Sequence, residues 1–308
     1  MLLSELILIF VLLTQAWMGL LGNSVLLVVY SRIFISQPNR RKPTDLIFTH
    51  LSTINVVTML IHGATVLIFA TGIENKLEDV GCHIISYFRR VTRGLSICTT
   101  CLLSVFQAIT RLKPQATGCI TPSLVFFWIL HLSMYMNILT ATIPTYNVTG
   151  TVNRLNIKYC SDMFLQKYLT NMAFVVVITL RDVVFVLLMT WASGDMVLVL
   201  YQHHIQVRHI HSTNLSPRSS PETRATCTIL LLVTCFVFFY SSNCIIILSL
   251  TFLEYKDIRL TDAMTVLGAC YPALCPWVLI SSDPRVPKPH CILKKERSPS
   301  PPLDLCDV

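Results

Sequence analysis

Four charged side chains lie inside long apolar stretches of the sequence, where they could bind a ligand or one another. Arg89 and Arg93 are four residues apart, so a helix would place both on one face. Arg181 and Asp182 are neighbours in a second apolar stretch. Charged side chains are expensive to place in lipid, so all four are expected to face the interior of a helix bundle. Two uses stay open: an ion pair between an arginine of the first stretch and Asp182, or contact with a polar ligand group such as a carboxylate or sulfate.

Two other groups of side chains resemble metal or redox sites but lack the pattern that such sites need. Cys98-x-x-Cys101 lies in the middle of an apolar stretch with no second Cys or His pair in register, which favours packed small residues at a helix interface. Four histidines fit no standard zinc spacing and are predicted to lie in a solvated loop. They are His203, His204, His209 and His211. The sequence holds no nucleophile–base–orienter set, phosphate-binding loop or carboxylate pair. We therefore expect that the protein binds neither a metal nor a cofactor and is not an enzyme.

The composition indicates that these groups lie in a membrane protein. Hydrophobic residues make up 53% of the 308 residues and charged residues 13%, against about 25% charged in soluble domains. The mean hydropathy is +0.63. The basic residues form no aromatic-interleaved patch, so nucleic acid is not an expected partner.

Seven apolar runs are near or above the ~20 residues that a membrane-spanning helix needs. They cover residues 6–30, 46–70, 84–109, 124–143, 169–200, 227–253 and 263–280. The first run has no basic segment before it and is too long for a signal peptide, so it is expected to be the first span. The predicted fold is an all-α membrane protein, a seven-transmembrane helix bundle.

The distribution of Lys and Arg predicts the orientation of the bundle. With the N-terminus outside, 14 of the 24 basic residues fall in the inner segments 31–44, 111–123, 201–226 and 281–308, and 6 fall in the outer segments. This positive-inside bias favours an outer N-terminus and an inner C-terminus, with the basic inner face attracted to anionic membrane lipid.

Two features of the outer segments bear on the same topology. Asn147-Val148-Thr149 is a glycosylation sequon on the expected outer side, whereas the sequon at Asn214 falls inside and is expected to stay unmodified. Cys82 and Cys160 both fall at the outer face, where an oxidising compartment permits a disulfide. From the residues alone, a bridge and two unrelated thiols both stay open.

Several strings along the chain are similar to those of one receptor family. The string Trp191-Ala192-Ser193-Gly194 begins a segment that continues to the two histidines at 203–204, and 211–226 reads H-S-T-x-L-S-P-R-x-S-P-E-x-R-A-T. Further strings are Gly22-Asn23, His50-Leu51 with Asn55, residues 93–110, and residues 275–283. Together they resemble the vomeronasal type-1 receptors over most of residues 19–285. This family consists of seven-helix, G-protein-coupled chemosensory receptors of the plasma membrane.

The resemblance implies a function and a set of partners. A small, volatile organic ligand would bind in the outer halves of spans three, five, six and seven, and a heterotrimeric G protein of the i/o class would bind inside. It favours a disulfide between Cys82 and Cys160. It also implies a receptor domain over 1–285 and a cytoplasmic tail over 286–308, in which Cys291 is a candidate for palmitoylation. The residues expected to face the G protein are Arg111, Lys113, His203, His204, Arg208 and Arg224.

The chain also departs from receptor patterns. Span three ends in Phe106-Gln107-Ala108 without an Asp-Arg-Tyr motif, and span seven has no Asn-Pro-x-x-Tyr; both absences resemble this family and argue against an opsin- or amine-type receptor. Asp195 stands where the family usually has an aromatic residue, and a carboxylate in a span costs roughly 2.5–3.5 kcal/mol unless it is paired or hydrated. The rival interpretations are a bitter-taste-type receptor and, from another class, a small membrane transporter.

Overall fold

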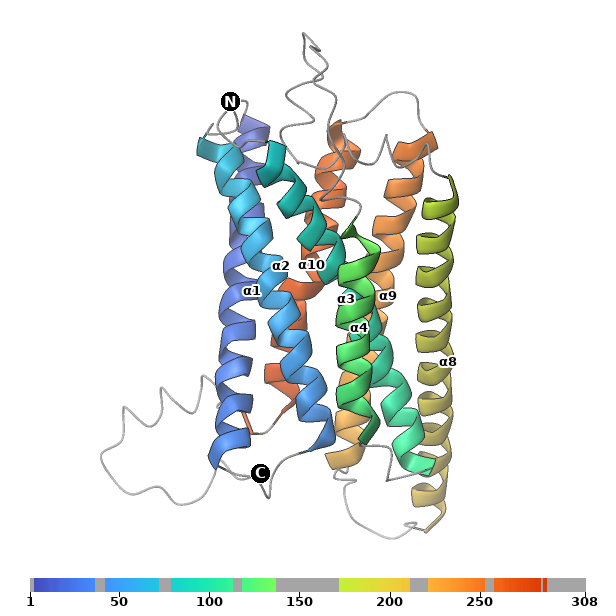
Figure 1. Ribbon diagram of the computed structural model, residues 1–308. Coiled ribbons are helices and arrows are strands. Elements are labelled where there is room, and N and C mark those ends of the chain that lie inside the picture. Colours follow the sequence, from blue (N-terminus) through green and yellow to red (C-terminus); the bar gives the residue numbers. More distant parts are fainter. Residues whose placement is uncertain are drawn as a thin grey trace, which may run out of the picture.

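The described residues form a bundle of seven helices (Figure 1). The computed structural model describes residues 3–36, 42–71, 79–112, 118–136, 172–210, 221–252, 258–283 and 285–286. The helices are α1 (Leu3–Ser36), α2 (Pro43–Thr71), α3 (Asp79–Leu112), α4 (Ile120–Met134), α8 (Met172–Ile210), α9 (Pro221–Phe252) and α10 (Ile258–Ser282). Six are long and apolar enough to cross a membrane, and α4 is a shorter apolar helix of 15 residues. The prediction of an all-α, seven-helix membrane protein is confirmed.

The outer surface and the interior of the bundle have reversed polarity compared with a soluble protein. Large apolar side chains such as Trp17 and Leu187 are exposed along the helices. Asn23, Thr100 and Ser104 are fully buried instead. This arrangement suits a lipid environment, because a helix satisfies its own backbone hydrogen bonds and polar side chains find partners inside the bundle, on their own helix or on a neighbouring one.

The long helix α3 connects the two sides of the bundle. It runs obliquely from beside α2 at the outer end to beside α8 at the inner end (Figure 1), and it packs against α2, α4, α8 and α9. On the other side, α1 packs against α2 and α10. The largest apolar cluster lies between these helices, with the ring of Phe236 edge-on to that of Tyr271 at 4.8 Å between centroids. A side chain on α3 can therefore reach most other helices of the bundle.

Close packing of α1 against its neighbours depends on two glycines. A Cβ atom on Gly19 would lie 2.6 Å from the Sδ of Met59 on α2. A Cβ atom on Gly22 would lie 2.8 Å from the Cγ of Pro276 on α10. Both distances are shorter than van der Waals contact, so only glycine permits this approach without movement of a neighbour.

A polar contact of α1 compensates a proline in α10. Pro276 has no backbone N–H, so the carbonyl of Pro272 lacks its usual intrahelical donor. Asn23 donates from Nδ2 to that carbonyl at 3.0 Å and to the carbonyl of Gly19 at 2.7 Å. The Nδ2 of Asn55 on α2 donates in turn to the Oδ1 of Asn23 at 3.3 Å. This buried network joins α1, α2 and α10.

Two of the predicted boundaries at the inner face are wrong. The sequence predicts a loop over 201–226, but α8 continues to Ile210 and α9 begins at Pro221. Residues 201–210 contain neither Gly nor Pro to end the helix, and proline is favoured at the first position of a helix. Three of the four histidines predicted to lie in a loop, at 203, 204 and 209, are therefore on a helix, and the histidine at 211 is outside the described residues.

Candidate functional site

The carboxylate of Asp182 is the centre of a polar network in the outer half of the bundle. Arg181, the preceding residue on α8, donates to its Oδ1 from Nε at 2.9 Å and from Nη2 at 2.6 Å. The hydroxyl of Tyr240 on α9 donates to its Oδ2. Charge-assisted hydrogen bonds of this kind are stronger than neutral ones, and this set links α8 to α9.

Arg93 on α3 reaches the same network through Tyr240. The Cζ of Arg93 lies 4.7 Å from the centroid of the Tyr240 ring, and Nη2 donates to the Sγ of Cys244 at 3.4 Å. A cation over an aromatic face is attracted by the ring quadrupole. The expected ion pair between an arginine of α3 and Asp182 thus takes an indirect form, in which Tyr240 lies between the two charges.

The network extends from Arg181 to α4. Nη1 of Arg181 donates to Nδ1 of His131 at 3.3 Å, and its Cζ lies 6.0 Å from the Tyr135 ring centroid. A guanidinium can only donate, so Nδ1 of His131 accepts and the proton of the neutral ring lies on Nε2, which faces the Sγ of Cys98 at 3.3 Å. His131 fits against α3 because residue 94 is glycine: a Cβ there would lie 2.5 Å from the histidine Nδ1.

The two thiols that resembled a metal or redox pair have separate surroundings. Cys98 faces His131, whereas Cys101 packs in the main apolar cluster. Among the described residues, no group of three or more His, Cys, Asp or Glu side chains is placed to hold a metal ion.

Arg89 belongs to a different part of the bundle. Its Nη2 donates to the Oγ1 of Thr65 on α2 at 3.2 Å. The two arginines that share a face of α3 therefore reach opposite neighbours, α2 for Arg89 and α9 for Arg93. Of the four charged residues singled out in the sequence, the structure joins Arg93, Arg181 and Asp182 and places Arg89 one turn further out. In the joined set, two guanidinium groups face one carboxylate.

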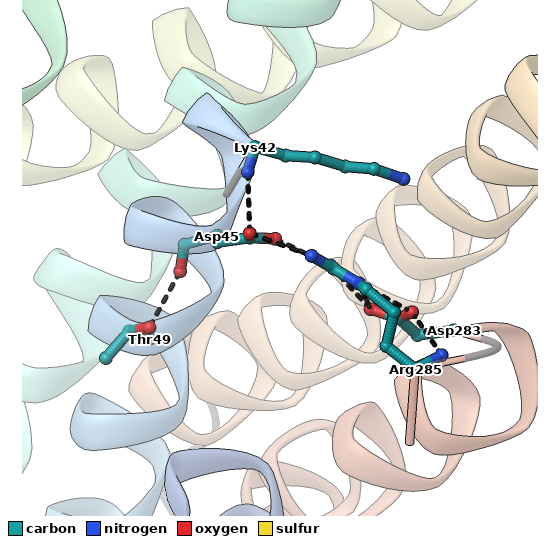
Figure 2. A network of polar contacts seen from close by, with 5 residues as sticks. All are labelled: Lys42, Asp45, Thr49, Asp283 and Arg285. Carbon is teal, nitrogen blue, oxygen red and sulfur yellow. Dashed lines mark hydrogen bonds and ion pairs between the residues drawn. The ribbon is translucent and has the colours of Figure 1, made fainter. Parts of the chain in front are cut away.

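A second charged cluster lies at the inner end of the bundle (Figure 2). Arg285 donates from Nη1 to Oδ2 of Asp45 at 2.9 Å and from Nη2 to Oδ1 at 2.7 Å. The same guanidinium donates to Asp283, from Nη2 to Oδ2 at 2.8 Å and from Nε to Oδ1 at 3.0 Å. The backbone N–H of Lys42 also donates to Oδ2 of Asp45 at 2.8 Å. This cluster ties the start of α2 to the segment that follows α10.

The electrostatics of this inner cluster favour the charged forms. Burial opposes the charge on Arg285, but its hydrogen bonds to Asp45 and Asp283 prevail and raise its pKa above the usual value. Burial alone would raise the pKa of Asp283, but the hydrogen bonds from Arg285 outweigh it and hold that pKa below its usual value. Asp45 is fully buried, with an exposed fraction of 0%. The cluster is an ion triad with one cation between two carboxylates.

Sequence reasoning missed the residues that complete both clusters. Tyr240 and His131 are single polar residues in apolar runs, and nothing local marks their partners. Asp45 and Arg285 are 240 residues apart, so their pairing is invisible until the helices are placed. One signal in the sequence could have indicated the inner cluster. Asp45 lies at the start of an apolar run, and a carboxylate buried there needs a partner.

The remaining predicted site residues fall on helix ends or outside the described residues. Cys82 is in the first turn of α3, and Arg111 is in its last turn. His203, His204 and Arg208 lie on the last turns of α8, and Arg224 lies on the first turn of α9. These ends of α3, α8 and α9 meet at the inner end of the bundle (Figure 1). Lys113, Asn147 and Cys160 are outside the described residues.

Asp195 lies on the surface of the bundle. Its side chain is exposed on α8, one turn after Trp191, whose exposed fraction is 74%. It makes no hydrogen bond or ion pair with the residues that the structure describes. The carboxylate is therefore not part of the polar network around Asp182, although both residues are on α8.

A seven-helix membrane bundle with buried charges in its outer half and basic residues at its inner helix ends is the architecture of the class of G-protein-coupled receptors. The sequence model of the vomeronasal organ pheromone receptor family matches residues 7–291. The chain is 36% identical over 289 residues to vomeronasal type-1 receptor 4 of Homo sapiens, which covers 89% of this chain and 93% of that protein. It is 35% identical over 288 residues to vomeronasal type-1 receptor 3 of Homo sapiens, covering 90% and 91% of the two chains.

A more distant relative gives the same result. The olfactory receptor class A-like protein 1 of Danio rerio is 31% identical over 285 residues, covering 88% of this chain and 87% of that protein. The chain belongs to the vomeronasal type-1 receptor family. It is a multi-pass plasma-membrane protein and a chemosensory G-protein-coupled receptor of the pheromone type, and neither a bitter-taste receptor nor a transporter is favoured.

Proposed function

We propose that this receptor detects a small, volatile organic acid whose carboxylate binds Arg93 in the outer half of the bundle. The observation that carries the proposal is the set of hydrogen-bond and ring partners of this guanidinium, the thiol of Cys244 and the side chain of Tyr240. A guanidinium has five N–H donors and pairs best with a planar anion. A carboxylate would therefore be a stronger acceptor than either present contact. The ligand must be volatile and must also be an anion when it is bound. Short carboxylic acids meet both requirements, because they are volatile when neutral and anionic at neutral pH.

Arg181 and Asp182 have a positioning role in this proposal. Asp182 already accepts from Arg181 and Tyr240, so it holds the Tyr240 ring beneath Arg93. Because the network contains two guanidinium groups and one carboxylate, an added anion would balance its charge. Arg89, one turn further out on α3, would offer a second cation along the approach of the ligand.

The proposed response is a shift between two arrangements of the bundle. A ligand shifts such an equilibrium only by binding one arrangement more tightly than the other. Arg93 and Asp182 lie on different helices that Tyr240 joins, so an anion on Arg93 would change the contacts among α3, α8 and α9. The inner ends of the same three helices carry Arg111, His203, His204, Arg208 and Arg224, which together with Lys113 would contact a G protein of the i/o class.

Two outer features complete the proposal. A disulfide between Cys82 and Cys160 would hold the second outer loop over the start of α3, and Asn147 in that loop would carry a glycan. Treatment with a glycosidase should lower the apparent mass of the wild type, and the Asn147→Gln variant should show no such change.

The test of ligand recognition uses surface-expressed receptor and a reporter of i/o-class G-protein activation. Volatile carboxylic acids are compared with their methyl esters and with the matching alcohols. We expect acids to activate the wild type, Arg93→Gln to lose roughly 10- to 100-fold in potency for acids, and Arg93→Lys to lose less, because charge-assisted hydrogen bonds are worth about 1.5–3 kcal/mol. Arg90→Gln is the control for the loss of a cation on α3; its side chain projects about 100° around the helix from Arg89 and about 60° from Arg93. Equal potency of acids and esters, or an unchanged Arg93→Gln receptor, would contradict the proposal.

A further inference from the structure

An apolar layer closes the outer part of the junction among α1, α2 and α10. Leu12 of α1, Val66 of α2 and Val266 of α10 pack together in one cluster. One helical turn further into the membrane, the same three helices carry Gln15, His62 and Cys270. This second layer is polar, so the side chains at the junction change from apolar to polar within a single helical turn.

Gln15 presents an unused acceptor in this polar layer. Its Nε2 donates toward the carbonyl of Val266 at 3.4 Å and the Sγ of Cys270 at 3.3 Å. Its Oε1 is buried and has no hydrogen-bond partner among the described residues. The amide is thus anchored to α10 by its nitrogen, which leaves the oxygen as an acceptor.

His62 presents a second unused atom at the same level. Its exposed fraction is 7%, and its Nε2 has no hydrogen-bond partner among the described residues. The ring also interacts with the backbone of Leu12. A neutral imidazole carries one N–H; when that proton serves the Leu12 carbonyl, Nε2 is left as an acceptor. Buried polar atoms without a partner are rare and call for an explanation, such as a bound group.

The neighbouring charges decide which donor suits these two acceptors. Arg89, bonded to Thr65 one turn from His62, lies close enough to act electrostatically on the His62 ring. A guanidinium repels an ammonium group, so a cationic donor is disfavoured. A hydroxyl group is neutral, is small enough for a packed helix junction and has one proton, which it can donate to either of the two acceptors.

We infer that the Gln15–His62 layer is a second recognition site, which binds a hydroxyl group of the ligand. The inference rests on the proposed function, because it assigns the ligand an anionic end at Arg93 and a hydroxyl end at this layer. Arg89 and Arg93 are one turn of α3 apart, about 5–6 Å along the axis, so the two sites lie at adjacent depths. The ligand class is therefore a hydroxy carboxylic acid with an apolar body, and a plain acid binds less tightly.

The experiment uses purified receptor in lipid nanodiscs and four matched series of probes of graded chain length. These are fatty acids, their ω-hydroxy and ω-methoxy derivatives, and primary alcohols. The methoxy group keeps the oxygen but has no proton to donate. In the wild type, the best ω-hydroxy acid should bind roughly three- to tenfold more tightly than its methoxy counterpart, the value of one neutral hydrogen bond.

The variant that removes the acceptor used by the hydroxyl, His62→Phe or Gln15→Leu, should reduce this hydroxy-to-methoxy ratio toward one. His62→Gln retains an acceptor at this position, so this variant should keep most of the wild-type hydroxy-to-methoxy ratio. His50→Phe is the matched control: it removes a histidine of the same helix about three turns away, one that accepts from the Nε1 of Trp128 at 2.8 Å. If either test variant fails to fold, the wild-type ratio and the other variant still carry the comparison.

The outcomes separate the two proposals. A wild-type ratio near one, or a ratio unchanged in both test variants, would overturn the hydroxyl site and indicate that only water occupies the layer. If fatty acids bind and Arg93→Gln leaves their affinity unchanged, the anion site fails on its own. If alcohols bind in a manner that depends on His62 while acids do not bind, the hydroxyl site stands and the anion site falls. Absence of binding by every series counts against both.

Discussion

Arg285 and Asp45 form a two-point ion pair across 240 residues of sequence, with nitrogen–oxygen distances of 2.9 and 2.7 Å (Figure 2). The pair joins the start of α2 to the segment after α10, at the inner end of the bundle. Asp45 is fully buried, so its charge depends on Arg285 and on the backbone N–H of Lys42. The inner end of α10 is thereby held to α2 by charge as well as by packing.

Removal of one partner from this pair should destabilise the receptor strongly. Breaking a buried ion pair leaves an uncompensated charge and costs about 3–5 kcal/mol. We expect Arg285→Gln to lower the thermal unfolding midpoint in nanodiscs more than Asp283→Asn does, because loss of Arg285 leaves Asp45 without its cation. The charge-reversed double variant Asp45→Arg with Arg285→Asp should recover part of the loss. Equal midpoints for wild type and Arg285→Gln would refute this role.

The same cluster predicts a dependence of stability on acid pH. The pKa of Asp283 is lowered in the folded state from its usual value of 3.8, so its stabilising effect is fully present above that value and is lost as the pH falls through the lower folded pKa. The pKa of Arg285 is raised in the folded state, so the stabilisation that its charge contributes is present at acid and neutral pH and is lost only at very alkaline pH. The wild type should lose stability below about pH 4, and Asp283→Asn should have a flatter profile in the same range. Parallel profiles from pH 7 to pH 3 would exclude this contribution.

Tyr240 offers a way to separate the two halves of the outer network. Tyr240→Phe keeps the ring beneath Arg93 but removes the hydroxyl that donates to Asp182. Loss of one hydrogen bond to a charged group should cost about 1.5–3 kcal/mol of stability. Tyr240→Leu removes the ring as well and should lose more. Thermal unfolding of both variants gives the order, and a Tyr240→Phe receptor as stable as the wild type would show that Arg181 alone satisfies Asp182.

Much of this architecture could be predicted from the sequence, because hydropathy and charge act locally. All seven described helices overlap the predicted runs. The residues that each buried charged side chain contacts on other helices were not predictable. The sequence alone gives no reason for Arg93 to choose Tyr240 while Arg89 chooses Thr65, because that choice depends on the oblique path of α3. The extension of α8 was missed because polarity, rather than a helix-breaking residue, marked the expected end.

Two glycines provide a matched test of helix packing. A Cβ on Gly94 would lie 2.5 Å from His131, whereas a Cβ on Gly194 would meet nothing within 4 Å. Gly94→Ala should therefore displace His131 and cost about 1–3 kcal/mol through overpacking. Gly194→Ala should be neutral or slightly stabilising, since alanine is the better helix former. Thermal unfolding measures both, and the double variant Gly94→Ala with His131→Ala should lose less than the sum of the single changes. Similar effects at the two glycines would indicate that His131 can move aside freely.

Asn23 and Pro276 allow a thermodynamic cycle on the α1–α10 contact. Asn23 donates to the Pro272 carbonyl, which Pro276 leaves without its intrahelical donor. Asn23→Leu should cost about 1–3 kcal/mol, because that buried carbonyl then has no donor from Asn23. Pro276→Ala supplies an N–H at the position from which a helix normally donates to Pro272, so the Asn23→Leu change should be less costly in that background. The coupling energy is obtained from unfolding of the wild type, both single variants and the double variant. Strictly additive losses would mean that Asn23 acts through its other contacts, with Gly19 and Asn55, rather than by compensating the proline.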